Sequence, residues 1–120
     1  MPLIRCDYSP KLIEPNVLTN LVKLLLEQSI TTFHSSNDAV SIFTKPYDAA
    51  DHSTSAAEVE VRAKAAEFDD SSRSRSEVRQ EFIMQYQARL KSFWNEHQIL
   101  APLIFTITLE DWEVAVITAK

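Results

Sequence analysis

The order of the strands and helices that the hydrophobic periodicity predicts constrains the fold of this chain most, because the same order occurs twice. Leu3 to Tyr8 alternates imperfectly between apolar and polar residues, which predicts a strand. A helix is predicted from Asn16, as its N-cap, to about His34, since apolar residues recur there at helical spacing. A short apolar run over Ala39 to Thr44, stopped by Lys45-Pro46, predicts a second strand. The first half is therefore strand, helix, strand.

The second half repeats this order after a polar segment, Tyr47 to Ala57, that has no periodicity and predicts a flexible connection. Glu58 to Ala65 alternates strictly, as does a strand with one exposed face and one buried face. Ser74 and Glu77 form a Ser-x-x-Glu capping box, which predicts the start of another helix. The residues predicted to form the buried stripe of that helix are Val78, Phe82, Tyr86, Leu90, Phe93 and His97. A strand is predicted after the helix, from Leu103 to Leu109.

Two β-α-β repeats predict an α/β (α+β) fold with a four-stranded mixed sheet and two helices on one face. We expect a single domain over residues 1–120, with halves at about 1–46 and 57–120. The other face of the sheet is left uncovered, and we expect Leu3 and Phe105 to make it too apolar for water. The tail from Trp112 to Ile117 resembles a further strand without a partner. The sequence therefore predicts a homo-oligomer.

Composition excludes several classes of function. The chain has no glycine, so it contains neither a glycine-rich phosphate loop nor a GxGxxG turn. Its net charge of −5, from 12 Lys and Arg against 17 Asp and Glu, disfavours nucleic-acid partners and acidic membrane surfaces. No apolar run approaches the length of about twenty residues that spans a bilayer. The single Cys6, predicted to be a buried thiol, agrees with a cytosolic protein.

Pro2 is the first candidate for chemistry. If Met1 is removed, the nitrogen of Pro2 becomes a secondary amine that can accept and return a proton, mounted at the start of a strand. The alternative interpretation is that Met1 and Pro2 simply precede a first strand.

The arginines around the second helix start are the second candidate. Arg73, Arg75 and Arg79 lie in the sequence RSRSEVRQ. Guanidinium groups bind carboxylates bidentately, and a helix N-terminus adds its dipole, so the cluster predicts an anion site. The alternative is a solvated loop that neutralises Asp69 and Asp70.

The histidines and the hydroxyl residues predict neither a metal centre nor a catalytic triad. His34, His52 and His97 are far apart in sequence and have no partner at ligand spacing. No Ser or Cys stands in a nucleophile motif.

The start PLIRCDYS, the doubled β-α-β plan and the segment SRSEVRQ together resemble the tautomerase superfamily, most closely its 5-carboxymethyl-2-hydroxymuconate isomerase branch. The resemblance implies a cofactor-free isomerase in which Pro2 moves a proton between an enol oxygen and a distant carbon. It implies that Arg73 or Arg75 binds a carboxylate of a small substrate, and that the protein is a homotrimer. The branch also has an arginine early in its second strand, whereas residues 34–48 contain none.

Two hypotheses of function follow. The first is an isomerase, a keto-enol tautomerase acting on a small unsaturated 2-hydroxy or 2-oxo acid with Pro2 as base. The second is a noncatalytic oligomeric binding or structural protein of the same fold. Dehalogenation or decarboxylation with the same proline is a further alternative within the superfamily.

Overall fold

The computed structural model describes residues 2–47, 59–66, 75–100 and 102–110. The predicted strand at residues 112–117 and nearly all of the predicted connection at 47–57 lie outside this part of the chain. Among the described helices, none is long and apolar enough to cross a membrane. The elements, in chain order, are β1 (Leu3–Tyr8), α1 (Pro15–Phe33), the 3-10 turn η1 (Asn37–Ala39), β2 (Ser41–Pro46), β3 (Val59–Ala66), α2 (Arg75–Glu96) and β4 (Leu103–Glu110).

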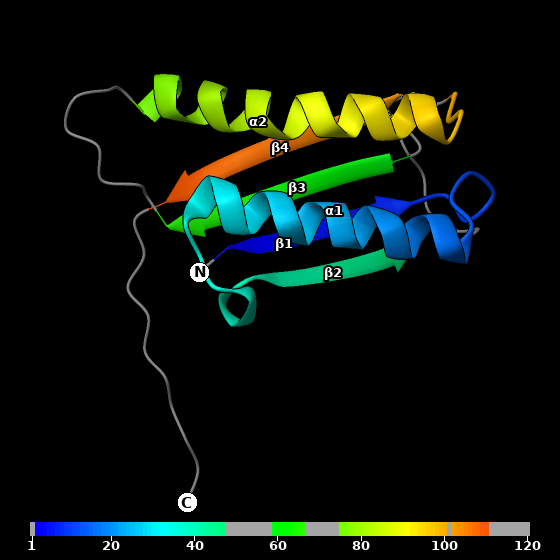
Figure 1. Ribbon diagram of the computed structural model, residues 1–120, viewed down its shortest axis with the longest axis horizontal. Helices are drawn as coiled ribbons and strands as arrows, with labels where there is room; N and C mark the ends of the chain where they lie inside the picture. The colour runs from blue at the N-terminus through cyan, green and yellow to red at the C-terminus, as the bar shows by residue number, and fades with distance from the viewer. Residues whose placement is uncertain (1, 48–58, 67–74, 101, 111–120) are drawn as a thin grey trace, which may run out of the picture.

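The four strands form one mixed sheet in the order β2-β1-β3-β4 (Figure 1). β1 and β2 are parallel, and so are β3 and β4, because a helix connects the two strands of each pair. The two halves meet at the centre, where β1 and β3 run antiparallel with Leu3 opposite Lys64. The predicted fold of two β-α-β repeats is confirmed.

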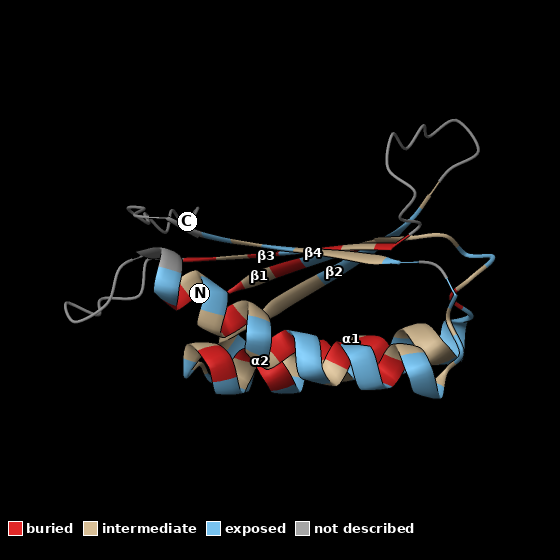
Figure 2. Cartoon of the chain, turned by 90° about the horizontal axis from the view of Figure 1, so that it is seen from above, coloured by how far each residue is buried: buried red, intermediate tan, exposed pale blue. Residues whose placement is uncertain are grey.

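Both helices cover the same face of the sheet, and the core lies between these two layers (Figure 2). Alternate residues of β1 and β3 point into this core, since side chains along a strand alternate between faces. The stripe predicted for α2 is buried as far as Phe93, while His97 follows the end of the helix. The most deeply buried apolar side chains include Ile4, Cys6, Leu21, Leu25, Val59, Val61, Tyr86 and Leu90.

Tyr86 is the residue around which the core is organised. Its side chain is fully buried, and its ring lies 4.8 Å from that of Phe105 and 6.5 Å from that of Phe33. The hydroxyl group hydrogen-bonds to Ser29 Oγ of α1 at 2.6 Å. One side chain thus joins both helices to the sheet.

Polar side chains continue the contact between the helices, which the apolar pattern did not predict. Gln28 donates from Nε2 to Thr32 Oγ1 at 2.8 Å, and Thr32 Oγ1 donates to Gln85 Oε1 of α2 at 2.8 Å. Both residues of α1 are buried, so these bonds satisfy groups that would otherwise lose their hydration. They also fix the position of one helix along the other.

Two element boundaries differ from the predictions. The N-cap of α1 is Glu14, without a side-chain capping bond, and Pro15 begins the helix, so Asn16 lies inside it. Proline suits the first position because its φ is already helical and it needs no acceptor for an N–H. β2 runs on through Lys45 to Pro46, which pairs with Tyr8. Since β2 is an edge strand in the described sheet, a proline is tolerated there.

The expectation of an apolar uncovered face was wrong for Phe105. Phe105 pairs with the buried Val61, and its ring packs on Tyr86, so it faces the helices. The residues on the other side of the strands are mostly polar or charged. We call this surface the open face, and its residues are Leu3, Arg5, Asp7, Ser41, Phe43, Lys45, Glu60, Arg62, Lys64, Ile104, Thr106 and Thr108.

Candidate active site

Pro2 is held at one end of the sheet, immediately before β1. Its side chain is buried, and its carbonyl oxygen accepts a hydrogen bond from the Ser41 N–H of β2 at 3.1 Å. Because β1 is a central strand, Pro2 has a strand on either side of its position. The sheet therefore fixes where this residue lies.

The start of α2 comes to the same end of the sheet as Pro2 (Figure 1). In the ladder, Leu3 pairs with Lys64 near the end of β3, and Lys64 pairs with Thr108 near the end of β4. A small cluster at this end joins the first turns of α2 to β3 and to the end of α1. Its members are Ala65, Val78 and Phe82, packed with Phe33 and Ile107.

The arginines expected to bind substrate are only partly described. Arg75 is the first residue of α2, so its backbone lies at the Pro2 end of the sheet. Arg73 lies outside the described residues, and so does the side chain of Arg75. Arg79, one turn further along α2, is half-buried. Which of Arg73 and Arg75 faces Pro2 stays a prediction.

The described histidines lie at opposite ends of the molecule. His34 follows the end of α1 in the left-handed backbone region, with φ 51° and ψ 40°, and its N–H donates to the Ile30 carbonyl. The ring of His97, after α2, lies 4.2 Å from that of Phe93. His52 lies outside the described part of the chain. Within that part, no three His, Cys, Asp or Glu side chains gather as metal ligands do.

Cys6 is a buried residue, as the sequence predicted. Burial, and after it the charge of Asp7, raises the pKa of the Cys6 thiol to about 12. Since the thiolate is the nucleophilic form, this thiol is inert at neutral pH.

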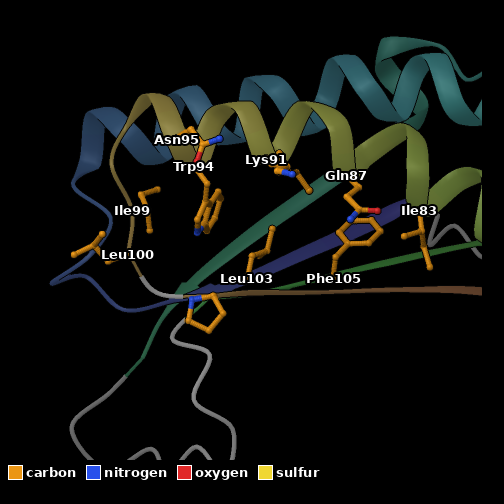
Figure 3. Close-up of a pocket in the computed structure, with 11 residues that line it drawn as sticks. Ile83, Gln87, Lys91, Trp94, Asn95, Ile99, Leu100, Leu103 and Phe105 are labelled. Carbon is orange, nitrogen blue, oxygen red and sulfur yellow. The ribbon is translucent and has the colours of Figure 1, made fainter.

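A groove with a volume of about 550 Å³ lies between α2 and β4 (Figure 3). Trp94 and Phe105 lie on opposite sides of it, and Gln87, Lys91 and Asn95 supply its polar groups. It includes Leu103, which pairs with Val59 at the end of the sheet opposite Pro2. The groove was not predicted from the sequence, because it depends on the distance between α2 and β4. The one local signal was the apolar pair Ile99-Leu100 after the helix.

Comparisons with known proteins identify the fold. No protein-family model matches the sequence, and no curated protein matches it. Among solved structures, a 5-carboxymethyl-2-hydroxymuconate delta-isomerase is similar with a TM-score of 0.64 and 10% identity, over 100% of this chain and 87% of that chain. A member of the cis-3-chloroacrylic acid dehalogenase family gives a TM-score of 0.65 and 13% identity, over 91% and 75%. A fused wild-type 4-OT, a symmetric trimer, gives 0.61 and 16%, over 92% and 85%.

The matched regions cover at least 91% of this chain and at least 75% of each similar structure. At 10 to 16% identity the similarity concerns the fold. The chain therefore has the fold of the tautomerase superfamily.

Proposed function

We propose that this protein is a cofactor-independent isomerase, a keto-enol tautomerase that moves a proton within a small unsaturated 2-hydroxy or 2-oxo acid such as a 2-hydroxymuconate. The observation that carries the proposal is the position of Pro2. It lies at the start of a central strand, at the end of the sheet where α2 begins. Superfamily structures with isomerase and dehalogenase names share this fold, which supports proton-transfer chemistry as a class.

Pro2 acts as the base once Met1 has been removed. An α-amino group has an ordinary pKa of about 8, so a useful fraction is neutral at physiological pH. The neutral amine accepts the proton of the enol hydroxyl, and the resulting ammonium group returns a proton to a carbon at the far end of the conjugated system. If Met1 is retained, the nitrogen is a tertiary amide with no basic lone pair.

Arg73 or Arg75 binds a carboxylate of the substrate and stabilises the dienolate charge that develops during transfer. The first turn of α2 adds backbone N–H groups without intrahelical acceptors and the positive end of the helix dipole. These features favour a small dianionic or monoanionic acid over a neutral substrate.

The protein functions as a homotrimer in this proposal. No described helix or strand covers the open face of the sheet, and a second copy would cover it (Figure 2). The fused 4-OT of the same fold is a symmetric trimer, which supports this assembly.

The decisive experiment compares forms of the protein that differ only at the N-terminus. Untagged protein that intact-mass measurement shows to begin at Pro2 is assayed with a generic enol acid at several pH values. We expect kcat/KM to rise with pH as the amine loses its proton. Pro2→Ala leaves a primary amine and should retain a little activity, whereas protein that carries Met1 should have none. Full turnover by the Met1 form would contradict the mechanism.

Alanine substitutions test the arginines separately. Replacing the arginine that binds the carboxylate should lower kcat/KM, because a charge-assisted contact is lost. The loss of transition-state stabilisation calculated from kcat/KM should be about 2 kcal/mol or more. Arg89→Ala is the matched control, since Arg89 lies further along α2 and pairs with Glu27 at 2.9 Å. Full activity in both Arg73→Ala and Arg75→Ala would indicate a solvated loop.

A second candidate function is that of a noncatalytic oligomeric binding or structural protein. It is favoured by the absence of any arginine over residues 34–48, where the resembling branch has one. Lys45 is the cation in this region, and its compact ammonium group does not bind a carboxylate bidentately. Protein that begins at Pro2 but is inactive on enol acids and on halogenated acrylic acids would support this candidate.

A further inference from the structure

The groove between α2 and β4 is a cavity that the proposed isomerase mechanism does not use. Its eleven lining residues come from α2, from the turn after that helix and from β4 (Figure 3). Gln87, Lys91 and Asn95 are each four residues apart, so they share one side of the helix. The groove includes Leu103 at the start of β4, whereas Pro2 lies at the end of the sheet where β4 ends. The groove is therefore separate from the proposed active site.

The core and the end of α2 hold the walls of the groove in place. The Phe105 ring lies 4.8 Å from the ring of the buried Tyr86. After α2, the Ile99 N–H donates to the Trp94 carbonyl at 3.0 Å, and Gln98 adopts the left-handed conformation with φ 53°. This is the hydrogen-bonded turn that commonly ends a helix, at a position where glycine is usual. A turn that is unfavourable for glutamine thus places Ile99 beside Trp94 (Figure 3).

The chain itself covers the apolar surface of the groove only in part. Leu90 is buried, but Trp94, Leu103 and Phe105 are half-buried, and Leu100 is 96% exposed. The volume of about 550 Å³ lies within the range of about 300 to 1,000 Å³ that is typical of small-molecule sites. Eleven residues are too few for a stable protein partner, which contacts about 20 to 30 residues on each side. The size therefore favours a small molecule.

Lys91 carries the one charge among the described residues that line the groove. Gln87 and Asn95, one turn before it and one turn after it, supply amide groups that can donate hydrogen bonds. Within the described part of the chain, none of these three side chains forms a hydrogen bond or an ion pair. No described carboxylate in the lining competes for the ammonium group. In a chain with a net charge of −5, this lining favours an anionic ligand.

We propose that this groove binds a small aromatic carboxylate, with its ring system between Trp94 and Phe105 and its carboxylate at Lys91. Lys91 lies between the two aromatic side chains along the groove, which brings the charge close to the apolar surface (Figure 3). The amide of Gln87 or Asn95 donates a further hydrogen bond to the carboxylate. Aromatic side chains favour a flat aromatic ligand over an alkyl chain, because ring contacts have a preferred geometry and add to the burial of apolar area.

Isothermal titration of the full chain with 2-naphthoate tests the proposal, because this probe combines two fused rings with one carboxylate. We expect saturable binding of one equivalent per chain with a Kd of about 100 µM, given the affinity that small ligands reach per atom. The matched probe is 2-naphthamide, which has the same rings without the charge and should bind at least about fivefold more weakly. The absence of saturable binding of 2-naphthoate up to about 1 mM would overturn the proposal.

Two substitutions separate the charge from the rings. Lys91→Gln should weaken 2-naphthoate at least about fivefold and change 2-naphthamide less than about twofold, since only the charge-assisted contact is lost. Trp94→Leu keeps an apolar side chain and should weaken both probes about fivefold. The control is Lys23→Gln, which makes the same charge change at an exposed position on α1, outside the groove. Circular dichroism establishes that each variant is folded, and Lys91 is exposed, so its replacement leaves the core intact.

A carboxylate is also the group expected at the Pro2 site, and the variants distinguish the two sites. Binding of 2-naphthoate that is unchanged in Lys91→Gln but lost in Arg73→Ala or Arg75→Ala overturns the inference. A change of oligomeric state in Trp94→Leu, measured by sedimentation equilibrium, would mean that a second copy occupies the groove, and it overturns the inference as well. Binding through Lys91 by protein that is inactive on enol acids supports the inference, although the proposed function would then fail.

Discussion

The two faces of the sheet are made by alternate residues of the same strands, yet they differ in almost every physical respect. The face beneath the helices is apolar, and it buries Ile4, Val61 and the ring of Tyr86. The open face carries Arg62 with its two carboxylate partners, all at least partly exposed. Burial of large side chains contributes several kcal/mol each, while exposed ion pairs contribute less than about 1 kcal/mol.

The difference between the two faces indicates which property of the protein each face determines. The covered face stabilises the single chain, because its contacts are hydrophobic or are hydrogen bonds shielded from water. The open face contributes little to folding, so its sequence is free to specify what it contacts. Pro2 lies immediately before β1, a strand that contributes side chains to both faces. The packing of the covered face keeps Pro2 in a fixed position.

The largest effect is expected from Tyr86→Ala. This substitution removes a fully buried ring from between the helices and the sheet, so it should lower the free energy of unfolding by about 3 to 5 kcal/mol. Tyr86→Phe is the control, because it removes only the hydrogen bond to Ser29 and should cost about 1 kcal/mol. Denaturant titration measures both values. A loss below about 1 kcal/mol in Tyr86→Ala would contradict the description of the covered face.

A smaller effect, counted per pH unit, is expected from alkaline pH. Burial raises the pKa of Tyr86 from 10.0 to about 12, and burial followed by Asp7 raises that of Cys6 from 9.0 to about 12. Between about pH 9 and pH 12 for Cys6, and between about pH 10 and pH 12 for Tyr86, the unfolded chain loses the proton while the folded chain keeps it. The free energy of unfolding should therefore fall as pH rises through this window, by about 1.4 kcal/mol per pH unit for each group.

Variants assign this alkaline effect to the covered face. Tyr86→Phe and Cys6→Ala each remove one titrating group, so each should flatten the pH dependence measured by denaturant titration. An unchanged slope in both variants would mean that the dependence arises elsewhere.

The smallest effect is expected from Arg62→Ala on the open face. Its ion pairs are exposed, so the free energy of unfolding should fall by less than about 1 kcal/mol when it is measured at about 0.5 M salt. Arg89→Ala, which breaks the exposed pair with Glu27, should have a similar effect. A loss above about 2 kcal/mol for Arg62→Ala alone would show that the open face also stabilises the chain.

The sequence was informative where the alternation was strict. Residues 59–65 alternate between small apolar and charged side chains, and both faces of β3 were predicted correctly from that pattern. In β4 the run Leu103-Ile104-Phe105 is apolar throughout, so no pattern indicated which residues face the helices. The pairing of Phe105 with Val61 and its ring contact with Tyr86 show that Phe105 faces the helices. The burial of Ser29 and Thr32 was not predicted, because both residues are polar. Their hydrogen-bond partners on α2 explain the burial, and no local pattern indicates those partners.

The candidate site could be predicted only in part. The antiparallel pairing of β1 with β3 places Pro2 and the start of α2 at one end of the sheet. The identity of the substrate-binding arginine is not set by topology, since Arg73 and Arg75 differ by two residues at a helix boundary. The groove beside Trp94 depends on the distance between α2 and β4, which no local pattern contains.

The antiparallel pairing of β1 with β3 has a consequence for the number of sites. It relates the two β-α-β halves by an approximate half-turn, so the start of β3 at Val59 is the counterpart of the start of β1 at the other end of the sheet. The chain continues into Val59 from residue 58, so the nitrogen there is an amide. A terminal amine can occur at one of these two equivalent positions only. Each chain therefore holds at most one site of the proposed kind.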